Sequence, residues 1–166
     1  MKKLKIIKYP DLFLKQKCLL VTSYDKELKT FAEDMLEIMY KSEGIGLSAI
    51  QVGVLKRLIV VDVSEEQNKP LVLVNPVIKP SGGKIVDFKE GCLSFPGIYE
   101  SVKRIEEIEV DYNNVSGKQL TIKATGLLSI CIQHEVDHLD GIVFLDKLSG
   151  LKRNRAEKKY LKNLNK

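Results

Sequence analysis

The stretch Gln133-His134-Glu135-Val136-Asp137-His138 contains both histidines of this 166-residue chain. On a helix, two histidines four residues apart lie on the same face, so both imidazoles can bind one divalent metal ion. The glutamate between them places a proton acceptor beside that ion. Because the chain has no further histidine, a third protein ligand would have to be a cysteine or a carboxylate.

The residues around this motif predict a helix that faces the protein core. Thr125 is a candidate N-cap, and Gly141 is a candidate stop signal. A single histidine on an apolar stripe is more often a core residue than a ligand, but two at this spacing around a glutamate favour a metal site. The motif residues continue an apolar stripe at helical spacing, which consists of Leu127, Ile130, Cys131, His134, Glu135 and His138.

The motif leaves the third ligand open. One zinc-protease pattern places a histidine six residues after the second motif histidine, where this chain has Phe144. Another pattern uses a glutamate about one helix further along, and Glu157 is the candidate at that distance. The basic neighbours of Glu157 favour a solvated, salt-bridged face for this residue instead.

The three cysteines are the remaining candidates. Cys131 lies one turn before His134, where joint coordination with both histidines is awkward, so we expect a buried thiol there. The neighbours of Cys18 give no sign of a site. Cys92 differs, because Glu90-Gly91-Cys92-Leu93-Ser94-Phe95-Pro96-Gly97 sets it between a glycine and a turn that breaks the preceding strand. Such a turn can present a thiolate together with free backbone N–H groups.

Three segments resemble the three signatures of the peptide deformylase family, in the same order and at matching spacing. The opening Ile7-Lys8-Tyr9-Pro10-Asp11 also resembles the N-terminal segment of that family, so the likeness covers almost the whole chain. The chain departs from the family pattern at Ser48, where alanine is usual, and at Tyr99, in a region where many members carry an arginine near the substrate. The three segments are Gly44-Ile45-Gly46-Leu47-Ser48-Ala49-Ile50-Gln51, Glu90-Gly91-Cys92-Leu93-Ser94 and His134-Glu135-Val136-Asp137-His138-Leu139-Asp140-Gly141.

The resemblance implies a metal-dependent hydrolase rather than an endopeptidase. Its expected substrate is the N-terminal formyl-methionine of newly synthesised proteins, from which it would release formate. The implied metal ligands are Cys92, His134 and His138, with water at the fourth position. The family's physiological metal is Fe²⁺, one ion per chain, and Zn²⁺ or Ni²⁺ can occupy the same site.

The resemblance also implies a role for further residues. Glu135 would take a proton from the attacking water and pass it to the departing amine. The Gln51 side-chain amide and the Leu93 backbone N–H would stabilise the negative charge that develops on the formyl oxygen. Gly46 would form a peptide-binding edge. The residues expected to bind the substrate are Ile45, Gly46, Gly91, Leu127, Ile130 and Cys131.

Length and pattern predict one α+β domain over residues 1–166. Hydrophobic residues make up 44% of the sequence, which is enough for a sizeable core. We expect antiparallel or mixed sheets wrapped around the metal-binding helix, with an N-terminal helix and a C-terminal helix. The N-terminal helix should begin near residues 23–25 and end before a glycine-rich loop at 44–46. Strands are expected at about 58–63, 71–78, 84–88, 105–112 and 120–124.

Positive charge is concentrated at the C-terminus. Residues 147–166 form a predicted basic helix with a net charge of +7, against −2 for the rest of the chain. Such a segment is usually a solvated helix, but the resemblance implies docking on the ribosome near the exit tunnel, through phosphates. We expect no sequence-specific nucleic-acid binding, because Tyr160 is the only aromatic residue there. The candidates to pack this helix on the domain are Leu148, Leu151, Leu161 and Leu164.

The remaining features point to the cytoplasm. Lysines interrupt the N-terminal apolar residues and no apolar run approaches a membrane span, so we expect neither a secretory signal nor a membrane partner. Three cysteines, an odd number, favour a reducing compartment.

Two rival functions remain at this level. A zinc endopeptidase would need a ligand at Phe144 or near Glu157, and a metal-stabilised binding module would close its tetrahedron with a fourth side chain.

Overall fold

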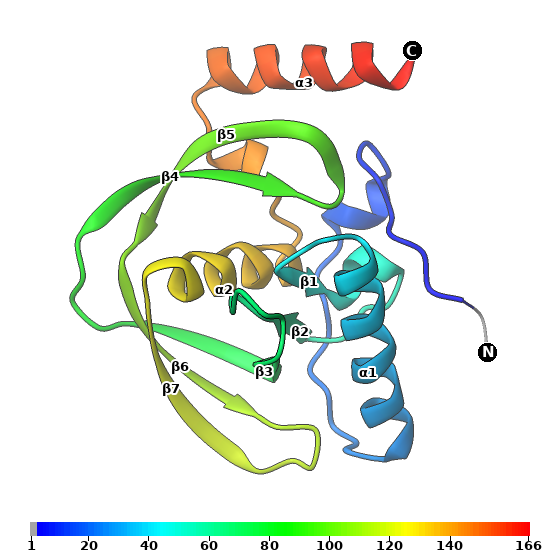
Figure 1. The fold of residues 1–166 in the computed structure, drawn as a ribbon, viewed down its shortest axis with the longest axis vertical. Coiled ribbons are helices and arrows are strands. Elements are labelled where there is room, and N and C mark those ends of the chain that lie inside the picture. The colour runs from blue at the N-terminus through cyan, green and yellow to red at the C-terminus, as the bar shows by residue number, and fades with distance from the viewer. Residues whose placement is uncertain (1–2) are drawn as a thin grey trace.

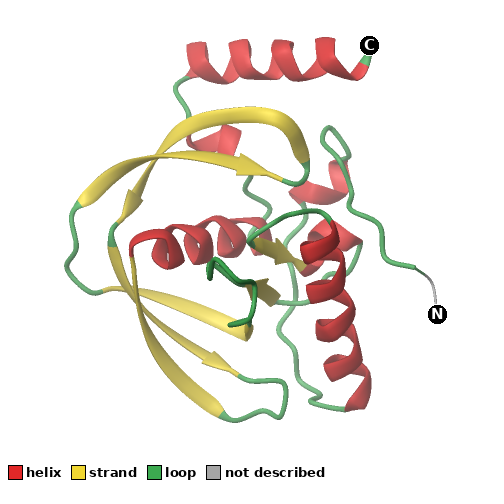
Figure 2. Ribbon diagram, in the orientation of Figure 1, coloured by secondary structure: helices red, strands yellow, loops and turns green. Residues whose placement is uncertain are grey.

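The computed structural model describes residues 3–166 as an α+β fold, in which α2 runs through the middle of the molecule (Figures 1 and 2). The strands β6 and β7 pass on one side of α2, and the strands β4 and β5 pass between α2 and α3. The elements, in chain order, are η1 Leu12–Lys15, α1 Lys26–Lys41, β1 Gly46–Ser48, η2 Ala49–Val52, β2 Leu58–Val61, β3 Leu71–Pro80, β4 Ile85–Cys92, β5 Phe95–Ile105, β6 Glu107–Asn113, β7 Gln119–Thr125, α2 Gly126–Leu139, η3 Phe144–Lys147 and α3 Gly150–Leu164.

The strands form two antiparallel sheets. The larger has five strands in the order β1-β2-β3-β6-β7, and the smaller consists of β4 and β5. Because β3 pairs with β6, the β4–β5 hairpin leaves the large sheet between these two strands and folds over α2. The α+β prediction is therefore confirmed in its antiparallel form. Within residues 3–166, parallel pairing is limited to an isolated bridge between Leu19 and Lys56.

Two clusters of apolar residues hold α1 and α2 against the large sheet. One face of α2, including Ile132 and Val136, packs on sheet residues such as Ile59 and Val110. The buried residues of α1 recur at helical spacing and pack on the β1–β2 side of the sheet. The Asp25 side chain caps α1 by accepting the Leu28 N–H at 2.9 Å, so the predicted start of this helix is confirmed.

Two strands were not predicted. β1 lies in the expected glycine-rich loop, and its three residues are too few for an alternating pattern to be visible in the sequence. β5 follows Cys92, where Pro96 and Gly97 indicated an irregular turn. In the structure only Leu93 and Ser94 separate the paired residues Cys92 and Phe95, and the chain continues as an eleven-residue strand. Pairing with β4 outweighs the local turn signals.

The helix α3 packs by different residues from those predicted. Leu151, Leu161 and Leu164 are exposed. Of the four leucines, only Leu148 joins the apolar cluster around Phe95 and Phe144, on which the helix packs. Ala156 and Tyr160, four residues apart, provide the buried face instead, because a small residue allows close approach and the aromatic ring fills the space beside it.

The prediction of a salt-bridged face at Glu157 is also wrong. The Glu157 carboxylate accepts a hydrogen bond from the Tyr9 hydroxyl, which lies 148 residues earlier in the chain.

Along the described residues, no helix combines the length and the apolar character needed to cross a bilayer.

Candidate active site

The helix α2 carries six of the predicted site residues, and its two ends lie next to the predicted Thr125 and Gly141. Thr125 precedes it in an extended conformation, as an N-cap residue does, and the helix ends at Leu139. Gly141 follows in the left-handed region with φ +74°. A Cβ at Gly141 would lie 2.3 Å from the carbonyl oxygen of Lys15, so the chain at η1 can pass against this turn only because the residue is glycine.

The three predicted metal ligands converge. Cys92, at the end of β4, meets His134 and His138 of α2, and their ligand atoms all lie within 4.8 Å of one another. The Cys92 Sγ lies 3.4 Å from His138 Nε2. The alternatives are not ligands: Phe144 has no donor atom and packs against Phe95 and His134, and Glu157 contacts Tyr9.

The other two cysteines have the buried positions that were predicted for them. Cys131 lies on α2 and its thiol donates to the carbonyl oxygen of Ile45 at 3.5 Å. Cys18 is buried in the core cluster that includes Ile50 and Leu139. Burial raises the pKa of the Cys18 thiol to about 11, so it remains protonated at neutral pH.

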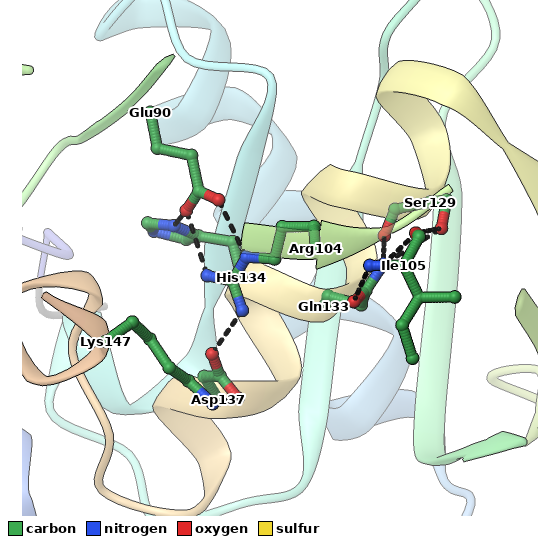
Figure 3. A network of polar contacts seen from close by, with 8 residues as sticks. All are labelled: Glu90, Arg104, Ile105, Ser129, Gln133, His134, Asp137 and Lys147. Carbon is green, nitrogen blue, oxygen red and sulfur yellow. Dashed lines mark hydrogen bonds and ion pairs between the residues drawn. The ribbon is translucent and has the colours of Figure 1, made fainter. Parts of the chain in front are cut away.

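A buried ionic network orients His134 (Figure 3). His134 Nδ1 lies 2.7 Å from Glu90 Oε1, so with its Nδ1–H donated to this carboxylate the imidazole keeps its Nε2 lone pair for a metal ion. Arg104 donates two hydrogen bonds to Glu90, from Nε at 2.7 Å and from Nη2 at 2.9 Å. Its Nη1 donates to Asp137 Oδ2 at 2.6 Å. The network thus connects β4, β5 and α2.

A second group of hydrogen bonds joins β5 and α2, one residue further along β5 than Arg104 (Figure 3). The Gln133 side chain accepts the Ile105 N–H at 3.1 Å and donates to the Ile105 carbonyl at 2.7 Å. Ser129 Oγ donates to the same carbonyl at 2.8 Å. Because Arg104 and Ile105 are consecutive, these contacts fix how the β4–β5 hairpin sits on α2, and therefore how Cys92 meets the histidines.

Sequence reasoning missed this network. Glu90 belongs to the segment that contains Cys92, so its proximity to the site could have been anticipated, but its partner on α2 could not. Arg104 stands in a strand that was itself not predicted. Asp137 lies inside the histidine motif, where its side chain had no assigned partner.

The electrostatics of the donor set fit a metal cation. Burial lowers the pKa of His138 well below its ordinary value, which keeps this imidazole neutral. Burial also lowers the pKa of His134, but the Cys92 sulfur and the Glu90 carboxylate outweigh it, and the net pKa is raised. Positive charge is therefore favoured at the point where the three donors meet. A metal ligand must be deprotonated, so a metal cation would replace the proton that the raised pKa favours on His134.

Glu135 lies beside the donors without being one of them. Burial raises the pKa of its carboxyl to about 7. Within residues 3–166, Glu135 Oε2 is a buried oxygen without a hydrogen-bond partner. A carboxyl group with these properties can accept and return a proton near neutral pH.

A pocket of about 560 Å³ opens beside these groups. Leu93, His134 and Glu135 line it, whereas Gln51 and His138 lie outside its lining. All six residues predicted to bind the substrate are in its wall, namely Ile45, Gly46, Gly91, Leu127, Ile130 and Cys131.

At Gly46, β1 passes close to α2. A Cβ at this position would lie 2.6 Å from Glu135 Oε1 and 2.7 Å from Cys131 Sγ. A larger residue would therefore displace the Glu135 carboxylate.

Tyr99, noted in the sequence as a departure from the family pattern, also lines the pocket, and its ring packs against Gly91. Lys8 and Phe88 contribute to the wall as well and were not predicted.

The Gln51 side chain is buried and held in one orientation. Its Oε1 accepts the Ser48 N–H at 3.0 Å and the Ser48 hydroxyl at 2.9 Å. Its Nε2 donates to Ser94 Oγ at 3.1 Å and points at Cys92 Sγ at 3.5 Å. The departure at Ser48 thus adds a hydrogen bond that fixes which way the Gln51 amide faces.

Comparison with known proteins agrees with this geometry. The sequence model of the polypeptide deformylase family matches residues 3–154. The chain belongs to the peptide deformylase family. Members of this family are metallo-hydrolases that remove the N-formyl group from nascent peptides. The matched range ends near the start of α3, so most of that helix lies beyond it.

The relatives resemble the chain over 84% to 97% of its length. The peptide deformylase of Picosynechococcus sp. is 53% identical over 142 residues, which cover 84% of this chain and 76% of that protein. The crystal structure of a peptide deformylase from Legionella pneumophila superposes with a TM-score of 0.92 at 42% identity, covering 97% of this chain and 95% of that one. The Synechococcus elongatus deformylase in complex with actinonin gives a TM-score of 0.90 at 42% identity, covering 96% and 88%.

Proposed function

We propose that this chain removes the formyl group from N-terminal formyl-methionine with Cys92, His134 and His138 as metal ligands. The observation that carries the assignment is that these three donors converge beside a pocket that is lined by two of them, Cys92 and His134, and by the Glu135 carboxylate. A thiolate and two imidazoles suit a divalent transition metal. A metal ion held there would act as a Lewis acid and lower the pKa of a coordinated water to about 7.

Glu135 is the proposed acid and base. Its carboxylate would take the proton of the attacking water and then give it to the amine that leaves as the new amino terminus. The pKa of about 7, raised by burial, supports both halves of this exchange at neutral pH.

Gln51 and Leu93 are the proposed donors to the formyl oxygen. The Gln51 amide is oriented by Ser48 with its nitrogen towards Cys92, and Leu93 follows Cys92 directly in the chain. Two donors beside the ligand sulfur can stabilise the negative charge that develops on the formyl oxygen when the formyl carbon becomes tetrahedral. Each such donor is worth about 10²–10³ in kcat.

The pocket supports a peptide substrate with an apolar first side chain. Ile45, Leu127 and Ile130 supply apolar surface, and Gly46 of β1 offers a backbone edge on which an extended peptide can add. We propose ferrous iron as the physiological metal, with zinc or nickel also able to bind. Metal analysis after anaerobic purification tests the choice.

Two rival functions are disfavoured by separate observations. An endopeptidase would need a ligand at position 144 or at Glu157, but Phe144 has no donor atom and Glu157 contacts Tyr9. A purely structural metal site would need a fourth protein donor, whereas this donor set opens on a pocket that also contains Glu135. A formate-release assay on formyl-Met peptides, together with metal quantification, tests the assignment. Stoichiometric metal without formate release would contradict it.

We further propose that the basic helix α3 brings the enzyme to the ribosome in the cytoplasm. The three cysteines are free, which suits a reducing compartment. Ala156 and Tyr160 face the protein, while Arg155, Lys158 and Lys159 are available for phosphate contacts.

Replacing Arg155, Lys158 and Lys159 with glutamine should weaken co-sedimentation with ribosomes and flatten its dependence on salt, with activity on a short formyl-Met peptide unchanged. Ribosome binding that is unaltered across a salt series would contradict docking through α3.

A further inference from the structure

The two proposed oxyanion donors come from elements far apart in the chain. Gln51 belongs to η2, and Leu93 belongs to the two-residue turn between β4 and β5. Neither element is paired with the other in a sheet. Misplacement of a catalytic group by about 1 Å can cost on the order of 10²-fold in rate, so some part of the fold must hold these two donors in register.

The segment Ile7–Tyr9, which we name the N-terminal bracket, contacts both elements. The Ile7 N–H donates to the Gln51 backbone carbonyl at 2.7 Å. The Lys8 ammonium donates to the Leu93 carbonyl at 2.7 Å, and the Tyr9 N–H donates to the Ser94 carbonyl at 2.9 Å. The bracket therefore donates hydrogen bonds to both carbonyl oxygens of the turn and does not bind the Leu93 N–H.

A buried hydroxyl completes the connection. Ser94 Oγ donates to the Ile7 carbonyl at 2.7 Å and accepts from the Gln51 Nε2 at 3.1 Å. One side chain of the turn thus contacts the bracket and the Gln51 amide at once. Because Ser94 is fully buried, water cannot replace these bonds at little cost.

The far end of the bracket is fixed to the body of the protein. The Tyr9 ring stacks on Phe95 with centroids 4.6 Å apart, and the Tyr160 hydroxyl of α3 donates to the Tyr9 carbonyl at 2.8 Å. The bracket is therefore held at one end by β5 and α3, while Ile7 reaches η2. A segment held in this way can hold the turn and η2 in a fixed relation.

We propose that the N-terminal bracket positions the two oxyanion donors, and that Lys8 and Ser94 are positioning residues for the reaction. The proposal rests on the proposed function, because it takes Gln51 and Leu93 as the donors. Neither Lys8 nor Ser94 touches the reacting atoms. Lys8 holds the turn through the Leu93 carbonyl, and Ser94 holds the turn against the Gln51 amide.

The main test is the metal-loaded full chain with Lys8→Met, which keeps the aliphatic stem and removes the ammonium. Lys8 is exposed, so the variant should fold and retain metal. We expect kcat on a formyl-Met peptide to fall by about 3- to 10-fold with KM unchanged, the size of one hydrogen bond. Lys8→Arg should restore most of the loss. Lys5→Met, at an exposed lysine two residues before the bracket, is the matched control and should keep wild-type kcat.

Ser94→Ala tests the buried part of the bracket. It should lower kcat by about 10- to 100-fold, because the Gln51 amide loses a buried partner. Tyr40→Phe is the control, since it removes a partly buried hydroxyl that donates to Asp62, away from the bracket and the pocket. Both variants should lower the melting temperature, and only Ser94→Ala should reduce kcat in protein that retains its metal.

The outcomes separate this proposal from the function on which it rests. A Gln51→Ala variant with wild-type kcat would overturn the oxyanion assignment and the bracket together. Reduced kcat in Gln51→Ala, beside unchanged kcat in Lys8→Met and Ser94→Ala, would overturn the positioning role alone. A rise in KM without a change in kcat for Lys8→Met would make Lys8 a substrate contact and would also overturn the positioning role.

Discussion

The site has two halves that are built in different ways. In the helix half, His134, Glu135 and His138 lie within five consecutive positions of α2, and backbone hydrogen bonds of the helix set their spacing. In the hairpin half, Cys92 and Leu93 stand at the end of β4, and contacts from distant segments determine where they lie. A short-range pattern thus specifies one half, and a set of long-range contacts specifies the other.

This difference explains where the polar network lies. The Arg104 guanidinium and the Glu90 carboxylate are buried between the halves, at a point where apolar packing alone would allow the hairpin to slide along α2. Bidentate geometry between guanidinium and carboxylate permits only one arrangement. The helix half has less need of such contacts, because its geometry follows from the helix itself.

The largest effect is expected from removing the hairpin half's ligand. Cys92→Ala should abolish both metal retention and formate release, because two histidines alone do not hold a transition metal tightly enough. Cys131→Ala, at a buried thiol of the helix half, is the control and should retain metal. Metal content of the purified variants measures the outcome. A metal-free Cys131 variant beside a loaded Cys92 variant would reverse the assignment.

The next effect concerns chemistry in the helix half without loss of metal. Glu135→Gln should keep stoichiometric metal while kcat falls by about 10²–10⁴, since the amide cannot exchange a proton with water and amine. Steady-state formate release and metal analysis on the same preparation measure both quantities. Near-normal turnover in a loaded variant would refute the acid–base role.

A smaller effect is expected at the junction of the halves. Arg104→Met should weaken metal binding by about 10- to 100-fold, because Glu90 loses the partner that holds it against His134. It should also lower the free energy of unfolding by about 3–5 kcal/mol, since the buried Glu90 carboxylate loses its cationic partner. Lys103→Met, at the exposed neighbouring position, should change neither quantity. Equal metal affinity in Arg104→Met and wild type would show that the halves meet without this network.

The smallest effect lies outside both halves, at Asp146 of η3. Burial raises the pKa of its carboxyl, but the Val143 N–H and the Lys15 and Arg153 side chains outweigh it and lower the pKa below the ordinary 3.8. A group with a lowered folded-state pKa stabilises the protein above its unfolded-state pKa and loses that contribution as pH falls through the folded-state pKa. Asp146→Asn should therefore be less stable than wild type at neutral pH, and the difference should shrink as the pH falls below 3.8.

Melting temperatures from pH 7 down to pH 2.5 measure this difference. If the gap between Asp146→Asn and wild type stays constant over that range, the Asp146 carboxylate does not contribute through its charge.

Much of the helix half could be predicted because its signals are local. The range of α2, its N-cap residue Thr125 and the shared face of the two histidines follow from spacing along a single helix. Cys92 could be singled out from its turn, and the roles of Gln51 and Leu93 came only from resemblance to a family. The strand β5 was missed because its stability comes from pairing with β4, and α3 packs through Tyr160 rather than through the leucines that its sequence suggested.

The sequence by itself therefore determined the metal-binding helix, the candidate ligands and the family, because helical periodicity and short motifs are properties of neighbouring residues. Only the tertiary structure decided which groups orient those ligands. Arg104 meets Glu90 and Asp137, and Lys8 meets Leu93, across separations of 14 to 85 residues along the chain. No local pattern encodes such pairs, because they form only when the hairpin, the helix and the N-terminal segment pack together.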